Sequence, residues 1–248
     1  MEPQRELLQT MEEDTLAKSP VAFEAYYRPL VHKERDRRPF YDCTVRDTYA
    51  VVSYAFDEED SKTFCVKNIP KNESVPGKHA EIILIEKLQG MLEEKRKSTS
   101  PTKMTVHVYQ NYSPCNTSGC CYALLKFKSD QKKGGTDVTM EVIFASLYNI
   151  NRPKCDEERC GHSYGRKSYR VDDEISSKNK EGLEALNQEI GIRTFTKDDW
   201  TLVANALSTN NPTTLLAQKK EDEPTRHVED KRMKEDLADI IGAEEGKT

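Results

Sequence analysis

The chain has 248 residues, of which 33% are charged and 35% are hydrophobic, and its formal net charge is −5. This length accommodates one domain of about 150 to 200 residues together with polar extensions. The negative charge argues against a protein that coats nucleic acid without specificity, because such proteins are usually strongly basic.

No segment approaches the roughly 20 consecutive apolar residues of a membrane-spanning helix, so no membrane association is expected. The first residues show no basic region leading into an apolar one, so no secretory signal is expected. We therefore expect a cytoplasmic or nuclear protein, or both, whose seven cysteines are ligands or buried thiols rather than disulfides.

We expect three parts along the chain. Residues 1–18 are polar and acidic and predict a mobile arm, and residues 19–209 predict one domain with a charged insertion at 150–180. Residues 210–248 predict a polar, partly disordered tail. Near the end of this tail a narrow apolar stripe at helical spacing could dock on the domain or on a partner.

Strands and helices alternate through the domain. Strands expected at 48–56 and 63–69 flank a turn at 57–60 and predict a hairpin. Further strands are expected at 104–109, 138–148 and 192–195, and helices at 79–92, 120–128, 181–189 and 197–207. This alternation predicts an α/β sandwich with a mixed sheet.

Two short motifs carry the chemistry: Lys78–Glu81 at the start of an expected helix, and Ser113–Cys121 after an expected strand. A His, a Glu two residues later, and then Pro-Cys with a second Cys close behind form the signature of a zinc-dependent nucleobase or nucleoside deaminase. His79, Cys115 and a second cysteine would hold the zinc, whose bound water has a pKa lowered to about 7. Glu81 lies too close to His79 along the chain to bind the same ion comfortably, and it is expected to move protons.

The second cysteine ligand is Cys120 or Cys121, and helix register separates the two. If Cys120 faces the metal, Leu124 and Phe127 share its inward face. If Cys121 faces it, the inward face includes Lys128, whose charge disfavours burial. The register therefore favours Cys120.

On these motifs the chain resembles the AID/APOBEC family of zinc-dependent polynucleotide cytidine deaminases, as a divergent branch. The resemblance covers about residues 40–207 apart from the insertion, and it extends to the strand Val142–Tyr148 and the closing segment Glu181–Asp199. It implies a three-layer cytidine-deaminase-like sandwich with a five-stranded mixed sheet. It also implies hydrolytic deamination of cytosine to uracil in single-stranded DNA or RNA.

The resemblance implies roles for further residues. Tyr148 would stack on the target base, and Tyr112, where the family usually has Trp, would wall the pocket. Asn72 would correspond to an Asn that contacts the sugar. The basic run Arg28–Arg38 stands where the family has a substrate-contacting loop, and it is otherwise a solvated loop.

Two other functions are also compatible with the sequence. A catalytically weak deaminase-fold module that binds nucleic acid or protein would fit the acidic charge balance, and a free cytidine deaminase would use the same two motifs.

The insertion contains a second group of possible metal ligands. Cys155, Cys160 and His162 could form a second metal site with one more ligand, or could be free side chains of a mobile loop.

Overall fold

The computed structural model of the chain describes residues 47–71, 76–150, 172–207 and 223–242. Its elements, in chain order, are β1 (Tyr49–Phe56), β2 (Lys62–Lys67), α3 (Ala80–Ser98), β3 (Lys103–Tyr112), α4 (Cys120–Lys133), β4 (Asp137–Ser146), α5 (Asp173–Glu189), β5 (Gly191–Thr194), α6 (Lys197–Leu207) and α8 (Glu223–Ile241). The arm at residues 1–18 lies outside the described residues, and the division into arm, domain and tail stays a prediction.

The five strands form one mixed sheet in the order β2-β1-β3-β4-β5. β1 is antiparallel to β2 and to β3, whereas β3, β4 and β5 are parallel to one another. Parallel neighbours need a crossover connection, and α4 and α5 lie in the two crossovers. The predicted α/β class with a five-stranded mixed sheet is confirmed, and the architecture is consistent with a cytidine-deaminase-like sandwich.

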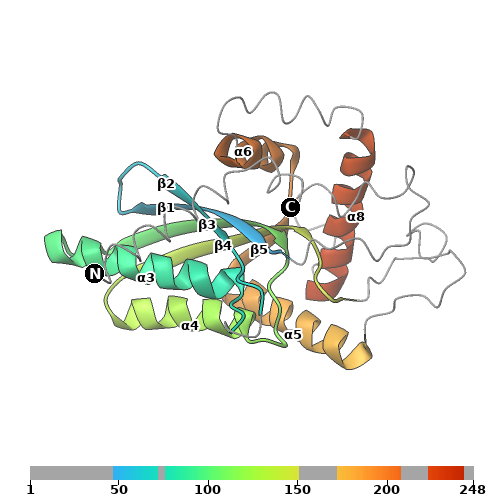
Figure 1. The fold of residues 1–248 in the computed structure, drawn as a ribbon, viewed down its shortest axis with the longest axis horizontal. Helices are drawn as coiled ribbons and strands as arrows, with labels where there is room; N and C mark the ends of the chain where they lie inside the picture. Colours follow the sequence, from blue (N-terminus) through green and yellow to red (C-terminus); the bar gives the residue numbers. More distant parts are fainter. Residues whose placement is uncertain (1–46, 72–75, 151–171, 208–222, 243–248) are drawn as a thin grey trace, which may run out of the picture.

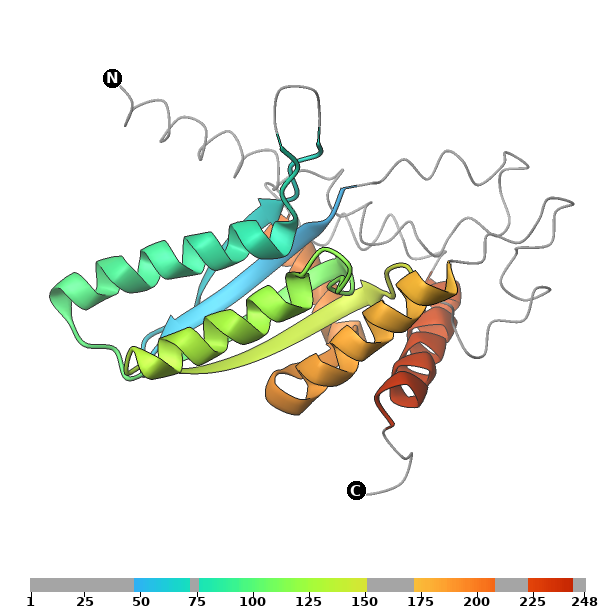
Figure 2. The same cartoon turned by 90° about the horizontal axis from the view of Figure 1, so that it is seen from below.

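Helices cover the two faces of the sheet unequally. α3, α4 and α5 lie side by side over one face, the inner face, whereas α6 lies on the opposite, outer face (Figures 1 and 2). Lys103 and Thr105 at the start of β3 are exposed, while Met104 and Val106, which alternate with them, are buried in the inner core. Towards the end of β3 both faces are covered, because α6 packs there on the outer side. The carboxyl end of β3 is thus buried on both faces of the sheet.

Three helices are longer than the sequence pattern predicted. α4 continues beyond residue 128 to Lys133. α3 continues through the polar segment 93–98, where basic residues in its last turn complement the helix dipole. Arg96 also holds this end by donating to the Gln131 and Thr136 side chains at 3.3 and 3.0 Å. α5 begins at Asp173, within the stretch assigned to the insertion, because Asp172 caps the helix by accepting from the amides of Glu174 and Ile175.

α8 lies beside the edge strand β5 and against α5 (Figure 2). The apolar stripe predicted in the tail docks on the domain, since Leu237 and Ile240 join the inner core. None of the described helices is both long and apolar enough to cross a membrane.

Candidate metal centre

The candidate site lies at the carboxyl ends of the parallel strands β3 and β4. The two strands end level with each other, because Tyr112 pairs with Ser146. An isolated bridge between Ile69 and Lys78, with both amide-to-carbonyl distances at 2.8 Å, brings the start of α3 next to the end of β2. The amino ends of α3 and α4 therefore converge at the carboxyl end of these strands. Ligand sites in open α/β sheets commonly lie at this end of the sheet.

Three predicted ligands meet at this end of the sheet. The Sγ atom of Cys115 lies 3.4 Å from His79 Nδ1 and 3.4 Å from Cys120 Sγ, and Cys120 Sγ lies 3.2 Å from the same nitrogen. Among the described residues, His79, Cys115 and Cys120 form a group that could hold a metal ion. Both cysteines are buried and His79 is half-buried.

The donor set fits zinc. Zinc bonds of about 2.3 Å to sulfur and about 2.0 Å to nitrogen place tetrahedral donor atoms roughly 3.5 Å apart, close to the separations found here. Two thiolates and one imidazole leave one tetrahedral position for another ligand. The structure thus shows a possible metal-binding group, and its assignment to zinc is a proposal.

The loop between β3 and α4 sets the positions of the two cysteines. Gly119, at the N-cap of α4, has φ of +78°, a left-handed conformation that favours glycine. Its amide donates to Asn116 O at 2.9 Å, which closes a tight turn between Cys115 and Cys120. This turn lets the two thiols face the same point although five positions separate them.

The two thiols differ in pKa because they are hydrogen-bonded to each other. A hydrogen bond between the two thiols, at an Sγ–Sγ distance of 3.4 Å, lowers the pKa of Cys115 to about 5. The same hydrogen bond, together with burial, raises the pKa of Cys120. A bound cation would favour the thiolate form of both cysteines.

Cys121 is buried beside this group but points elsewhere. Its thiol donates to Pro114 O at a distance of 3.6 Å, and burial raises its pKa to about 12. On the same helix Leu124 and Phe127 are buried, whereas Lys128 reaches Glu189 O and is only half-buried. These burials are the ones that the helix register predicted when it favoured Cys120.

Glu81 lies in the first turn of α3, next to the three ligands. The side chain is 3% exposed, and this burial raises the pKa of its carboxyl to about 7. The Glu81 carboxyl also shares a hydrogen bond with the Cys120 thiol. A buried carboxyl beside a cation site is placed to exchange protons with a molecule held there.

A pocket of about 120 Å³ opens onto this group. Tyr112 and Tyr148 form part of its wall, with ring centroids 5.8 Å apart and ring planes at 64°. Ser113 Oγ accepts from the Tyr148 amide at 2.9 Å, and the Ser113 amide donates to Ser146 O at 2.8 Å. The structure therefore places both predicted tyrosines beside the metal group.

Two pocket residues were not predicted from the sequence. Thr48 and Asn68 line the pocket, and Asn68 Oδ1 accepts from the Thr48 amide at 2.7 Å. The signal was the position of Asn68 directly after the return strand β2, at the edge where α3 begins. Asn72, which the family resemblance suggested as the residue that contacts the sugar, lies outside the described residues.

Two further predictions also fall outside the described residues. The proposed second metal site, Cys155, Cys160 and His162, lies in the undescribed range 151–171. The basic run Arg28–Arg38 precedes the first described residue. Both stay predictions.

Comparison with models of known protein families finds no match for this chain, and comparison with curated proteins finds none either.

Proposed function

We propose that the protein is a zinc-dependent deaminase of the AID/APOBEC type, which hydrolyses cytosine to uracil in single-stranded DNA or RNA. The observation that carries the proposal is the buried carboxyl of Glu81 beside the His79, Cys115 and Cys120 group. Glu81 lines the same pocket as Tyr112 and Tyr148. A structural metal site needs four protein ligands and no acid, whereas a hydrolytic site keeps a position open and a carboxyl beside it.

The reaction replaces the exocyclic amine of cytosine by oxygen, consumes one water and releases ammonia. Zinc, when bound, would supply a water of lowered pKa at neutral pH. Glu81 would take one proton from the attacking water and pass it to the ring nitrogen, and would then transfer the second proton of that water to the departing amine. Tyr148 and Tyr112 would hold the base by ring contacts while Glu81 moves the protons.

Two alternatives keep specific support. The net charge of −5 favours a deaminase-fold module that binds a partner and has little catalysis. The pocket would also accept a free cytidine, since its described lining contains no residue that requires a polymer. Cytosine in a single strand is preferred because the resemblance is to polynucleotide deaminases and because Tyr148 offers a stacking surface.

The test is uracil formation by the zinc-loaded full chain on single-stranded DNA, single-stranded RNA and free cytidine. Glu81→Gln should retain zinc and lose activity by roughly 100-fold or more, the range for a general acid–base residue. An unchanged rate in this variant would refute the mechanism. Activity on free cytidine alone would select the nucleoside enzyme, and a zinc-loaded wild type that converts none of the three would select the binding module.

A further inference from the structure

A single asparagine of α5 connects the two loops that form the candidate site. Asn179 is 0% exposed and lies between the loop that follows Cys115 and the loop that contains Tyr148. An asparagine side chain can accept two hydrogen bonds and donate two. Asn179 makes all four, and each one goes to the backbone of these two loops.

The oxygen of the Asn179 amide holds the loop at 115–118, called the metal loop below because it contains Cys115. Asn179 Oδ1 accepts from the amide of Asn116 at 2.8 Å and from that of Thr117 at 3.3 Å. These amides directly follow Cys115, so the hydrogen bonds fix the backbone that carries this ligand. The Asn116 side chain adds a bond to Lys178 O at 2.9 Å, which keeps the same loop against α5.

The other half of the amide holds the tyrosine loop. Asn179 Nδ2 donates to Tyr148 O at 3.2 Å and to Asn149 O at 3.3 Å. Asn149 has φ of +49°, a left-handed conformation that an asparagine tolerates better than most residues. The chain therefore makes a sharp turn immediately after Tyr148, and Asn179 binds the carbonyls of that turn.

Gly182, three residues further along α5, makes this approach possible. A Cβ atom at this position would lie 2.6 Å from Asn116 Cβ and 2.8 Å from Cys121 Sγ, closer than such atoms pack. Only glycine lets α5 come near enough for the short Asn179 side chain to reach both loops. Asn179 and Gly182 thus form one contact surface against the metal loop.

We infer that Asn179 is a positioning residue, which holds the loop of Cys115 and the loop of Tyr148 at a fixed separation. The inference rests on the proposed function. In that function, a fixed separation of the two loops would keep the base that stacks on Tyr148 in line with the metal and Glu81. Groups behind the ligands commonly set a metal site's geometry in this way. The role lies in the two-sided hydrogen bonding, which a residue that only fills space would lack.

The two halves of the amide can be separated by substitution. Asn179→Asp keeps an oxygen that accepts from Asn116 and Thr117 but replaces the donor to the Tyr148 loop by an oxygen that repels its carbonyls. Asn179→Ala removes both halves. Asn187→Asp, which makes the same charge change at an exposed position of α5, is the matched control.

Three readouts follow the two loops. Amide hydrogen exchange reports the backbone at 115–118 and at 146–150, cobalt(II) absorption of the substituted protein reports thiolate geometry, and chelator competition reports metal affinity. We expect Asn179→Asp to raise exchange only at 146–150, with cobalt spectrum and affinity unchanged. We expect Asn179→Ala to raise exchange in both segments and to weaken metal binding by roughly 10- to 100-fold. Asn187→Asp should change none of these.

Gly182→Ala is a second variant, for the case that Asn179→Ala does not fold. It should shift the cobalt spectrum and raise exchange at 115–118, because the added methyl displaces Asn116. Gly90→Ala in α3 is its control, since a Cβ there meets nothing within 4 Å. A Gly182→Ala spectrum identical to that of the wild type would count against the inference.

Failure of this inference and failure of the proposed function give different results. If Asn179→Asp leaves exchange at 146–150 unchanged, or loses metal as readily as Asn179→Ala, the inference is wrong whatever the enzyme does. If the wild type is inactive on every substrate, exchange and cobalt spectra still test Asn179. With an active wild type, Asn179→Asp should raise KM for the oligonucleotide roughly 10-fold at unchanged kcat, equivalent to about one lost buried hydrogen bond.

Discussion

Cys120 and Cys121 are neighbours in the chain, and their exposed fractions are only 0% and 1%. Their surroundings nevertheless differ, because a helix turns by about 100° from one residue to the next. Cys120 meets His79 and Cys115, whereas Cys121 meets the carbonyl of Pro114. Burial alone would therefore not distinguish a ligand from a packing residue at this site, but direction does.

Replacing each cysteine separately tests this difference. Cys120→Ser should weaken zinc binding by roughly 100-fold or more. This effect should exceed that of substituting a residue that only hydrogen-bonds to a ligand. Cys121→Ser should retain about one zinc per chain, since a hydroxyl can also donate to Pro114 O. Zinc content after dialysis, measured by atomic absorption, checks both variants. Metal loss in Cys121→Ser alone would reverse the ligand assignment.

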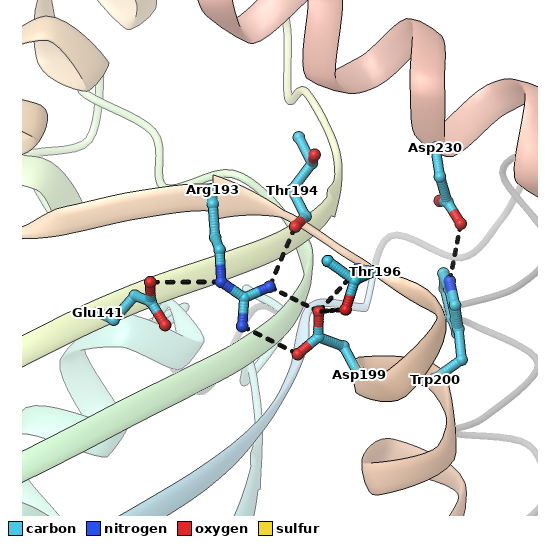
Figure 3. Close-up of polar contacts among 7 residues, drawn as sticks. All are labelled: Glu141, Arg193, Thr194, Thr196, Asp199, Trp200 and Asp230. Atoms are coloured by element: carbon cyan, nitrogen blue, oxygen red, sulfur yellow. Dashed lines mark hydrogen bonds and ion pairs between the residues drawn. The ribbon is translucent and has the colours of Figure 1, made fainter. Parts of the chain in front are cut away.

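At the scale of elements, α8 is held to the body by a small polar cluster as well as by its apolar stripe. The Arg226 guanidinium lies 4.1 Å from the centroid of the Trp200 ring and forms an ion pair with Asp230. Trp200 Nε1 donates to Asp230 at 3.0 Å, and Arg226 also donates to Ala145 O near the end of β4. The cluster thus joins α8, α6 and the strand that leads to Tyr148 (Figure 3 shows its Trp200–Asp230 contact).

Removing the guanidinium should loosen α8. Arg226→Met breaks a buried ion pair, which typically lowers the free energy of unfolding by about 3 to 5 kcal/mol. Trp200 is the one tryptophan of the chain, so its fluorescence reports this contact directly. We expect a red-shifted emission and a lower urea midpoint.

The matched control is Arg232→Met on the same helix. Arg232 is half-exposed and pairs with Glu229 at 3.6 Å, a contact worth about 0 to 1 kcal/mol. Equal destabilisation by the two substitutions would show that the Arg226 cluster has no special role.

At the scale of the whole molecule, a second polar network ties the sheet to α6 (Figure 3). Asp199 accepts from Arg193 Nη1 at 2.5 Å, and from the amide and hydroxyl of Thr196 at 2.7 Å each. The carboxylate of Asp199 thus accepts from the backbone amide of Thr196 at the start of α6, which is one of the two hydrogen bonds of a capping box. Arg193 also pairs with Glu141 at 3.3 Å, which joins β5 to β4.

This network predicts how stability depends on pH. Burial by itself would raise the pKa of Asp199, but hydrogen bonds from Arg193 and Thr196 lower it overall below the ordinary 3.8. A lowered pKa in the folded state means that the stabilisation is present above the unfolded pKa and is lost as pH falls through the folded one. Asp199→Asn should therefore be less stable than the wild type at pH 7, and this difference should shrink below pH ~3.5.

Urea unfolding of both proteins at pH 7 and in the acid range measures this difference. A gap in unfolding free energy that stays constant with pH would contradict the assigned role of Asp199. The comparison must use the same metal-free preparation, since zinc binding itself depends on pH.

The amino-acid sequence by itself determined the α/β class, the motif at Lys78–Glu81 and the choice of Cys120. These follow from local periodicity and spacing: strands alternate with a period of two, and one helix turn sets which cysteine faces inward. Helix ends were less predictable, as α3 and α5 show, because capping by Asp172 and the distant contacts of Arg96 decide them.

Only the tertiary structure decided that Asn68 lines the pocket, that α8 packs on the sheet edge, and that Asn179 joins the two loops. Asn179 meets Asn116 across 63 positions of the chain, and Arg226 meets Ala145 across 81. Contacts of this kind depend on how whole elements pack against one another, so the periodicity of residues within one element does not predict them. The sequence therefore specified the three residues that could hold a metal ion, whereas packing between elements supplied the residues that hold them in place.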